Sequence, residues 1–267
     1  MPSFHTIGIV LRVQNQGEQD RRAHLYTREH GKLDLFVKSG RKMQSKLAPH
    51  LEPLTVAECF IVRGRRDHLV AIERQDRLGG ARGNLQQLAM IAWAAELVDA
   101  FTKFDHPDQR IFHLLEFWCV FVERFGDGRL PERWRCLFLV SLLGYLGIGP
   151  ECNICVRCKK SDEPAWLFSA RDGGIICERC PHHPEGIFSL LETERLVLAE
   201  APKQEQRRWS LIESRALKES TARMLIEALL AEHGDIPIRS EQFLRWFDRE
   251  KFKLVEIEEK AYTSLHP

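Results

Sequence analysis

LGGARGN, at residues 78–84, separates two kinds of hydrophobic periodicity in this chain. Upstream of it, short apolar runs alternate in part with polar residues, a spacing typical of β-strands. Downstream, residues 85–104 (LQQLAMIAWAAELVDAFTKF) place apolar side chains three or four positions apart, as an amphipathic helix does. The stretch therefore predicts a change from β to α structure near residue 80.

Five short apolar runs precede this change, and turn-forming residues separate them. Five strands in one short segment predict a small closed barrel. The strand count fits an OB-fold and an SH3-like barrel equally well. The expected strands are FHTIGIVLRV (4–13), AHLYT (23–27), KLDLFVK (32–38), LTVAECFIVR (54–63) and HLVAIE (68–73).

Helical spacing dominates the remainder of the chain. Pro131 suits the first turn of a helix, and Ser189 with Glu192 has the spacing of a capping box. Gly234 is placed to end a helix, and Ser240 is placed to cap the last one. We expect helices at residues 85–104, 108–125, 131–146, 189–201, 213–233 and 241–250.

These elements predict an α+β protein with several domains. A small β-barrel is expected at residues 1–79. An α-helical domain is expected from residues 80–149 and 186–267, interrupted by a cysteine-rich insert at residues 150–185.

Four of the eight cysteines form two C-x2-C pairs, Cys155 with Cys158 and Cys177 with Cys180. The 18 residues between the pairs match the spacing of a four-cysteine zinc ribbon or knuckle. Four thiolates close the tetrahedral shell of one Zn²⁺ and leave no position for a catalytic water. The pattern therefore predicts a structural ion that supplies folding energy to a short segment.

Three neighbouring residues keep the ligand set open. Cys152 offers a competing pair with Cys155, and His182 or His183 is able to replace one thiolate. The other cysteines, at positions 59, 119 and 136, lie in apolar patterns that are typical of core residues.

The composition is that of an ordinary globular protein, with 44% hydrophobic and 29% charged residues. The N-terminus lacks the basic and long apolar segments of a signal peptide. The longest apolar run, near residues 137–149, is shorter than the roughly 20 residues that span a bilayer. We therefore expect a cytoplasmic protein without a membrane partner. Thiols stay reduced in the cytoplasm, so clustered cysteines there are expected to bind metal.

Motifs of catalysis are absent from the chain. It has no G-x-x-x-x-G-K-[ST] loop, no G-x-S-x-G and no H-E-x-x-H. A nucleobase deaminase needs H-x-E before P-C-x-x-C, whereas His183 and Glu185 follow the last cysteine pair here. We therefore expect no enzymatic activity, and a zinc-dependent hydrolase or deaminase is the less favoured alternative.

Positive charge is concentrated in the expected barrel, although the whole chain has a formal net charge of only +1. Residues 21–46 contain eight Lys or Arg against two carboxylates, and Arg63, Arg65 and Arg66 follow at a later turn. Such a patch suits a polyanion, because neutralised phosphates release counterions. No base-reading motif is visible, so binding should depend little on base sequence. The strand aromatics Tyr26, Phe36 and Phe60 are expected to be core residues rather than stacking platforms.

Seven segments follow one another along the chain: GIVLRV (8–13), GEQDRRAHLYTREHGKLDLFVKSGRK (17–42), SKLAPHLEP (45–53), LGYLGIGPE (143–151), CNICVRC (152–158), FSARDGGIICERC (168–180) and IPIRSEQFLRWF (236–247). In this order, and with this cysteine spacing, they resemble the RecO family of bacterial recombination mediators over nearly the whole chain. The chain departs from the family pattern at Lys159, where a glycine is usual, and at Cys152, which replaces an apolar residue.

The resemblance implies an N-terminal OB-fold that binds single- and double-stranded DNA, a helical C-terminal domain and one structural zinc ion. It also implies a role in recombinational DNA repair at the nucleoid. Members anneal complementary strands and, with RecR, help RecA to replace single-strand-binding protein (SSB) on DNA. A zinc-containing protein-interaction scaffold without direct DNA activity is the competing interpretation.

Site residues follow from the resemblance position by position. The first candidates for phosphate contacts are Arg21, Arg22, Lys38, Arg41, Lys42 and Lys46. Members of the family also bind the acidic, Phe-ending tail of SSB in a basic, apolar pocket of the helical domain. The residues assigned to that pocket are Arg124, Arg129, Arg133 and Arg135.

Overall fold

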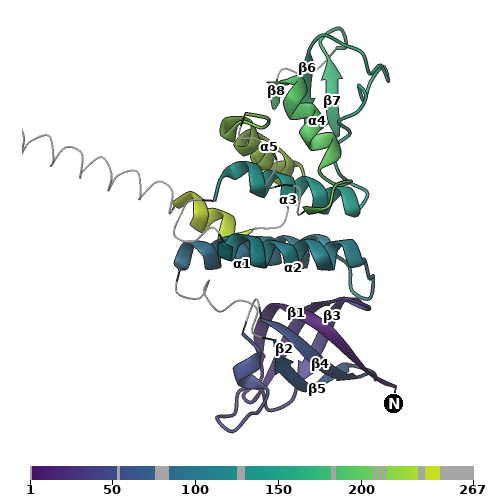
Figure 1. Ribbon diagram of the computed structural model, residues 1–267. Coiled ribbons are helices and arrows are strands. Elements are labelled where there is room, and N and C mark those ends of the chain that lie inside the picture. The colour runs from purple at the N-terminus through teal and green to yellow at the C-terminus, as the bar shows by residue number, and fades with distance from the viewer. Residues whose placement is uncertain are drawn as a thin grey trace, which may run out of the picture.

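The computed structural model describes residues 2–52, 55–75, 84–124, 130–181, 185–206, 209, 212, 215–233 and 238–246. In this part of the chain, a β-barrel, a group of helices and a small β-sheet follow one another along one long axis (Figure 1). The barrel lies at one end and the small sheet at the other. The basic segment and the cysteine pairs are therefore at opposite ends of the molecule.

The barrel is closed, with strand order β1-β2-β3-β5-β4. Neighbouring strands are antiparallel except β3 and β5, which pair in parallel at Leu35 with Asp67 and Phe36 with His68. The five predicted strands are confirmed, and this order makes the barrel OB-like. The strands are β1 (Ser3–Gln16), β2 (Asp20–Thr27), β3 (Gly31–Val37), β4 (Val56–Val62) and β5 (Asp67–Arg74), with a short helix η1 (Ala48–His50) between β3 and β4.

Alternation along each strand divides the barrel into an inner and an outer face. Leu25, Leu35 and Ile61 belong to the buried core inside the barrel. The helices form a second hydrophobic core, and Ile9 and Tyr26 on the outer face of the barrel belong to it. The barrel therefore packs against the helices through the outer side of β1 and β2.

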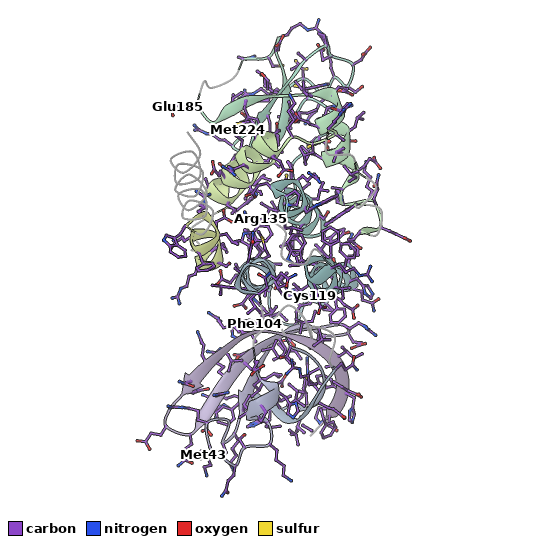
Figure 2. All side chains as sticks on the ribbon, turned by 60° about the vertical axis from the view of Figure 1, so that its left-hand side comes forward. Met43, Phe104, Cys119, Arg135, Glu185 and Met224 are labelled. Carbon is purple, nitrogen blue, oxygen red and sulfur yellow. The ribbon has the colours of Figure 1, made fainter. Side chains whose placement is uncertain are left out.

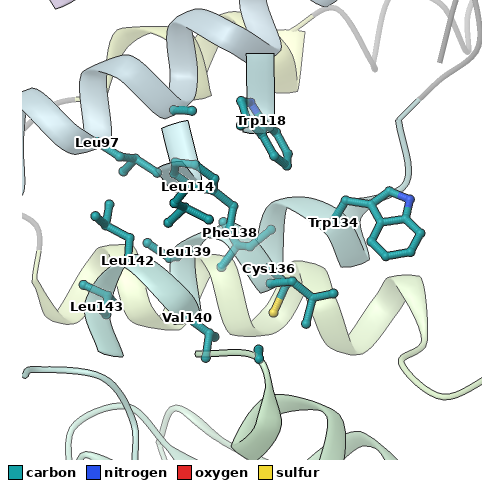
Figure 3. Packing of buried hydrophobic residues seen from close by; sticks show 14 of the residues in the cluster. Leu97, Leu114, Trp118, Trp134, Cys136, Phe138, Leu139, Val140, Leu142 and Leu143 are labelled. Carbon is teal, nitrogen blue, oxygen red and sulfur yellow. The ribbon is translucent and has the colours of Figure 1, made fainter. Parts of the chain in front are cut away.

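The helices are packed around a cluster of large aromatic residues. Trp118 packs against both Trp93 and Phe138, with ring centroids 6.0 and 5.0 Å away, and its indole N–H donates to the Met90 carbonyl at 2.9 Å. Figure 3 shows Phe138 directed towards Trp118 across the gap between two helices. The main helices are α1 (Leu85–Phe101), α2 (Gln109–Arg124), α3 (Glu132–Tyr145) and α5 (Glu219–Glu232), and residues 239–246 are also helical. The predicted change from β to α structure is thus confirmed.

Three predicted helix boundaries are wrong. Ser189 lies in strand β8 (Ile187–Leu190), and α4 (Glu192–Glu200) is capped instead by the Glu194 carboxylate, which accepts the Leu191 N–H at 3.0 Å. Helix α5 begins at Glu219 rather than at residue 213, because residues 215–217 form a turn and a bend. Ser240 lies inside a helical segment, where its N–H and hydroxyl both donate to Glu96.

A three-stranded sheet, in the order β7-β6-β8, forms the end of the molecule opposite the barrel. It consists of β6 (Trp166–Ser169), β7 (Gly174–Cys177) and β8. Among the helices that the structure describes, none combines the length and the apolar character needed to cross a bilayer.

Candidate nucleic-acid interface and metal centre

An open cleft of about 500 Å³ lies on the outer face of β2 and β3, beside the β4–β5 turn. In OB-folds, the face of strands 2 and 3 and the adjoining loops bind oligonucleotides. Phe104 and Asp105 reach the cleft from the chain after α1, because the Asp105 N–H donates to the Lys32 carbonyl of β3 at 2.9 Å. The side chains that define the cleft include Arg22, Asp34, Phe36, Arg63, Arg65, Arg66, Phe104 and Asp105.

The cleft contains both paired and unpaired arginines. Arg22 forms an ion pair with Asp34 on the neighbouring strand, and this hydrogen bond lowers the pKa of Asp34 below its ordinary value. Arg63 donates to Asp105 at 2.8 Å. Arg65 and Arg66 are exposed and form no ion pair with the residues described. These two guanidinium groups are thus available for an anionic ligand.

Phe36 gives the cleft an aromatic surface. Its half-buried ring lines the cleft and meets the exposed His68 edge-on, with centroids 5.3 Å apart. Tyr26, in contrast, is fully buried against the helices, as expected of a core residue. Phe36 is therefore a strand aromatic whose position suits base stacking, rather than the core residue expected from the sequence.

The β3–β4 loop carries four more cations. Residues 38–50 contain no Asp or Glu. Arg41 fastens the loop to the β1–β2 turn, because its backbone N–H donates to the Gln19 carbonyl at 2.9 Å and its guanidinium to the Gly17 carbonyl at 2.8 Å. Gln16, next to that turn, lines the cleft. The loop and the cleft therefore flank one turn.

The six predicted phosphate contacts fall into two groups. Lys38, Arg41, Lys42 and Lys46 are exposed together on the β3–β4 loop. Arg22 lies in the cleft but is balanced by Asp34, and Arg21 is half-buried at the start of β2. Arg65 and Arg66 belong to the cleft and were visible in the sequence only as a run of charge. Phe104 gave no sequence signal, since only the tertiary fold brings it to β3.

The four predicted zinc ligands form a compact cluster. All four sulfur atoms of Cys155, Cys158, Cys177 and Cys180 lie within 4.8 Å of one another. The Sγ atoms of Cys155 and Cys180 are 3.9 Å apart, and those of Cys158 and Cys177 are 3.7 Å apart. A tetrahedral ion with Zn–S bonds of about 2.3 Å requires S–S edges of about 3.8 Å. The donor set and its size therefore fit one tetrahedral metal ion.

Backbone geometry holds the thiols in place. The Val156 N–H donates to the Ile175 carbonyl of β7 at 2.9 Å, which docks the first pair onto the strand that carries the second. Burial alone would raise the pKa of Cys155, but the backbone N–H groups of Cys158, Cys177 and Arg157 outweigh it and lower the pKa to about 6. A thiol that ionises this readily is suited to metal binding. Lys159 has φ of +63°, the left-handed conformation that favours glycine.

The competing ligands are placed differently. Cys152 is buried among core residues and does not belong to the sulfur cluster. Burial raises the pKa of Cys152 to about 12, which keeps its thiol protonated. His182 and His183 lie outside the described residues.

Three of the four arginines assigned to an SSB-tail pocket are described, and their surroundings differ. Arg124 is exposed at the end of α2, and Arg129 lies outside the described residues. Arg133 donates to Glu219 at 2.8 Å and covers the Trp134 ring. Arg135 is buried inside the helical part (Figure 2), where it pairs with Glu132 and Glu241 and covers the Trp93 ring. Its burial contradicts a role in contacting an external peptide.

Comparisons with known proteins agree over both halves of the chain. Residues 1–78 match the family model "Recombination protein O N terminal", and residues 82–242 match "Recombination protein O C terminal". The chain is 32% identical to the DNA repair protein RecO of Bacillus subtilis (strain 168) over 176 residues, which is 65% of this chain and 67% of that protein. It is 33% identical over 196 residues to the DNA repair protein RecO of Dehalococcoides mccartyi (strain CBDB1), covering 73% of this chain and 76% of that protein.

Proposed function

Since this chain belongs to the recombination protein O (RecO) family, we propose that it is a DNA-binding mediator of recombination that catalyses no chemical reaction. The observation that carries this proposal is the joint position of the cleft and the β3–β4 loop. Exposed Arg65 and Arg66 on one side and four loop cations on the other flank the β1–β2 turn of an OB-like barrel. A nucleic-acid strand carries phosphates along its length, so one strand is able to contact both groups of cations.

The proposed activity is the annealing of complementary single strands. Two DNA strands repel each other, and a cationic surface that binds both lowers this repulsion. Positioning alone accomplishes this step, so neither a nucleotide nor a nucleophile is needed. With RecR as its partner, the protein promotes loading of RecA onto SSB-coated single strands, at the nucleoid in the cytoplasm.

The proposed contacts differ in what they contribute. Lys38, Arg41, Lys42 and Lys46 contact phosphates directly, together with Arg65 and Arg66 of the cleft. Arg22 contacts DNA only as part of its pair with Asp34, which leaves it little net charge. Arg21 is half-buried and contributes less than the loop cations. The acidic tail of SSB is assigned to the surface around Arg124, in place of the buried Arg135.

We propose that the four clustered cysteines bind one structural Zn²⁺. The ion has no open coordination position, so its role is to hold the cysteine segment against β7. This closed shell argues against a zinc-dependent hydrolase or deaminase, in which water must reach the metal.

Strand annealing tests the proposal most directly. Two complementary dye-labelled oligonucleotides are mixed with the protein, once bare and once coated with SSB, and pairing is followed by energy transfer. The proposal requires faster pairing of bare strands, and of SSB-coated strands when RecR is present. A protein that shifts no oligonucleotide at low salt is a protein-interaction scaffold instead.

A further inference from the structure

Met43 is the most exposed large apolar side chain among the residues described. Its relative exposure is 104%, and the next value, for Leu85, is 60%. Figure 2 shows Met43 at the end of the barrel farthest from the helices. A large apolar group in water gains free energy when a ligand covers it, so this loop tip is suited to an apolar contact.

The loop that carries Met43 has a defined shape. The Ser45 N–H donates to the Lys42 carbonyl at 2.9 Å, which closes a β-turn with Met43 and Gln44 at its two central positions. The Lys42 N–H donates to the Ser39 carbonyl at 3.1 Å, and the Ser39 N–H to the Asp20 carboxylate at 2.7 Å. These bonds tie the turn to the barrel and hold Met43 outward, so little order has to be gained on binding.

The charged side chains of the loop segment that carries Met43 are all positive. Lys38, Arg41, Lys42 and Lys46 are exposed on the same loop, without a carboxylate in residues 38–50. An apolar side chain surrounded by cations suits a ligand that carries anionic groups on its outside and apolar surfaces between those groups. Stacked nucleobases between phosphates have this arrangement, and DNA-bending proteins insert methionine or leucine side chains between base steps.

We propose that Met43 inserts between adjacent bases of a bound nucleic acid while the loop cations hold the flanking phosphates. The proposal rests on the DNA binding proposed above and adds a base contact to it. Insertion requires the bases to separate, which is easiest in single strands and at frayed duplex ends. The loop therefore favours unpaired or weakly stacked DNA over uniform duplex, without reading its sequence.

An anionic lipid surface has the same charge but fits the loop less well. Membrane-surface binding depends on the apolar area buried, and one side chain provides little of it. The loop is also continuous with β3, whose Phe36 lines the cleft, and it is fastened to the turn beside that cleft. A strand lying along β2 and β3 would thus pass close to Met43.

The test uses an oligonucleotide that contains 2-aminopurine, whose fluorescence rises when its neighbours unstack. Wild type should raise the fluorescence on binding. Met43→Ala should bind about five- to tenfold more weakly, with an unchanged salt slope and without the fluorescence rise. Met43→Leu should restore both. Met224→Ala removes the same atoms from α5 in the helical part (Figure 2) and should behave as wild type.

Three results would overturn the proposal. If Met43→Ala matches wild type in affinity and fluorescence, Met43 does not insert, although the DNA-binding function stands. If the variant loses binding only to phosphatidylglycerol vesicles, the loop contacts lipid. If wild type binds no oligonucleotide at low salt, the proposed function fails together with this contact.

Discussion

The carboxylate of Asp99 on α1 lies 2.9 Å from Nδ1 of His24 on β2 and joins the barrel to the helices. The same carboxylate is 3.2 Å from Nε of Arg12 and 3.6 Å from Nζ of Lys32. Burial would raise the pKa of Asp99, but the hydrogen bond with His24 and the charges of His24, Arg12 and Lys32 lower it. The single carboxylate of Asp99 on α1 therefore contacts three basic side chains of the barrel.

Asp99→Asn should destabilise the protein by about 3 kcal/mol, because Lys32 would remain buried without its counter-charge. The Lys32 side chain is only 6% exposed. Urea unfolding at pH 7 measures the change. Asp105→Asn is the matched control, since its pair with Arg63 is more exposed and should contribute less than about 1 kcal/mol. An equal decrease in the free energy of unfolding of the two variants would show that the buried Asp99 contacts stabilise the protein no more than an exposed ion pair does.

Acid should weaken the protein through the same carboxylate. The folded-state pKa of Asp99 is lowered, so its stabilising effect is fully present above the unfolded pKa of about 4. The effect is lost as the pH falls through the lower, folded-state value. The free energy of unfolding should therefore decline below about pH 5, and the decline should be shallower in Asp99→Asn. Parallel curves for wild type and variant would contradict this assignment.

Cys177→Ser should lose the bound metal and several kcal/mol of stability, on the order of a structural zinc site. Elemental analysis should give about one zinc per wild-type chain, since one four-sulfur cluster is present in the described part. Cys152→Ser keeps all four clustered sulfurs and should retain the ion. Loss of zinc from Cys152→Ser, with retention in Cys177→Ser, would point to a different ligand set.

Arg41→Ala with Lys42→Ala should weaken duplex binding and reduce its salt dependence. Removing one phosphate contact makes the slope of log K against log salt shallower by about 0.9. Arg65→Ala with Arg66→Ala should do the same, because these guanidinium groups carry no ion pair within the described residues. Arg223→Ala, an exposed arginine on α5, is the control. An unchanged slope in either double variant would remove that group from the interface.

Lys159→Gly should stabilise the cysteine segment by up to about 1 kcal/mol, because Lys159 has φ of +63°. Thermal unfolding of the metal-bound protein measures this gain. Lys160→Gly, at the next position, should give no gain, since Lys160 has no left-handed φ. A loss of stability in Lys159→Gly would mean that the lysine side chain itself contributes.

Local spacing was enough to predict the barrel, the three central helices and the four-sulfur cluster. Strand alternation and C-x2-C pairs act over a few residues and depend little on the remainder of the fold. The OB-like strand order could not be read in this way, because the parallel pairing of Phe36 with His68 joins strands that are not consecutive.

Three residues have surroundings that local sequence did not predict, because contacts with distant parts of the chain determine them. Ser189 has good capping chemistry, but its strand pairs with β6, opposite Leu167, and the helix starts later. Arg135 looks like a surface cation in the sequence, whereas two carboxylates, one from a distant segment, neutralise it in the interior. The ion pair of Arg22 likewise depends on strand register, which places Asp34 within its reach. Charge in a sequence therefore locates cations but does not say which of them are free.

In the described part of the chain, the linear order of barrel, helices and cysteine sheet places the two ends of the molecule on opposite sides of the helices (Figure 1). Two large ligands, one at each end, would not collide, because the helices keep them apart. Occupancy of the two ends should then be independent, and a ligand at the cysteine sheet should leave the affinity of the barrel unchanged.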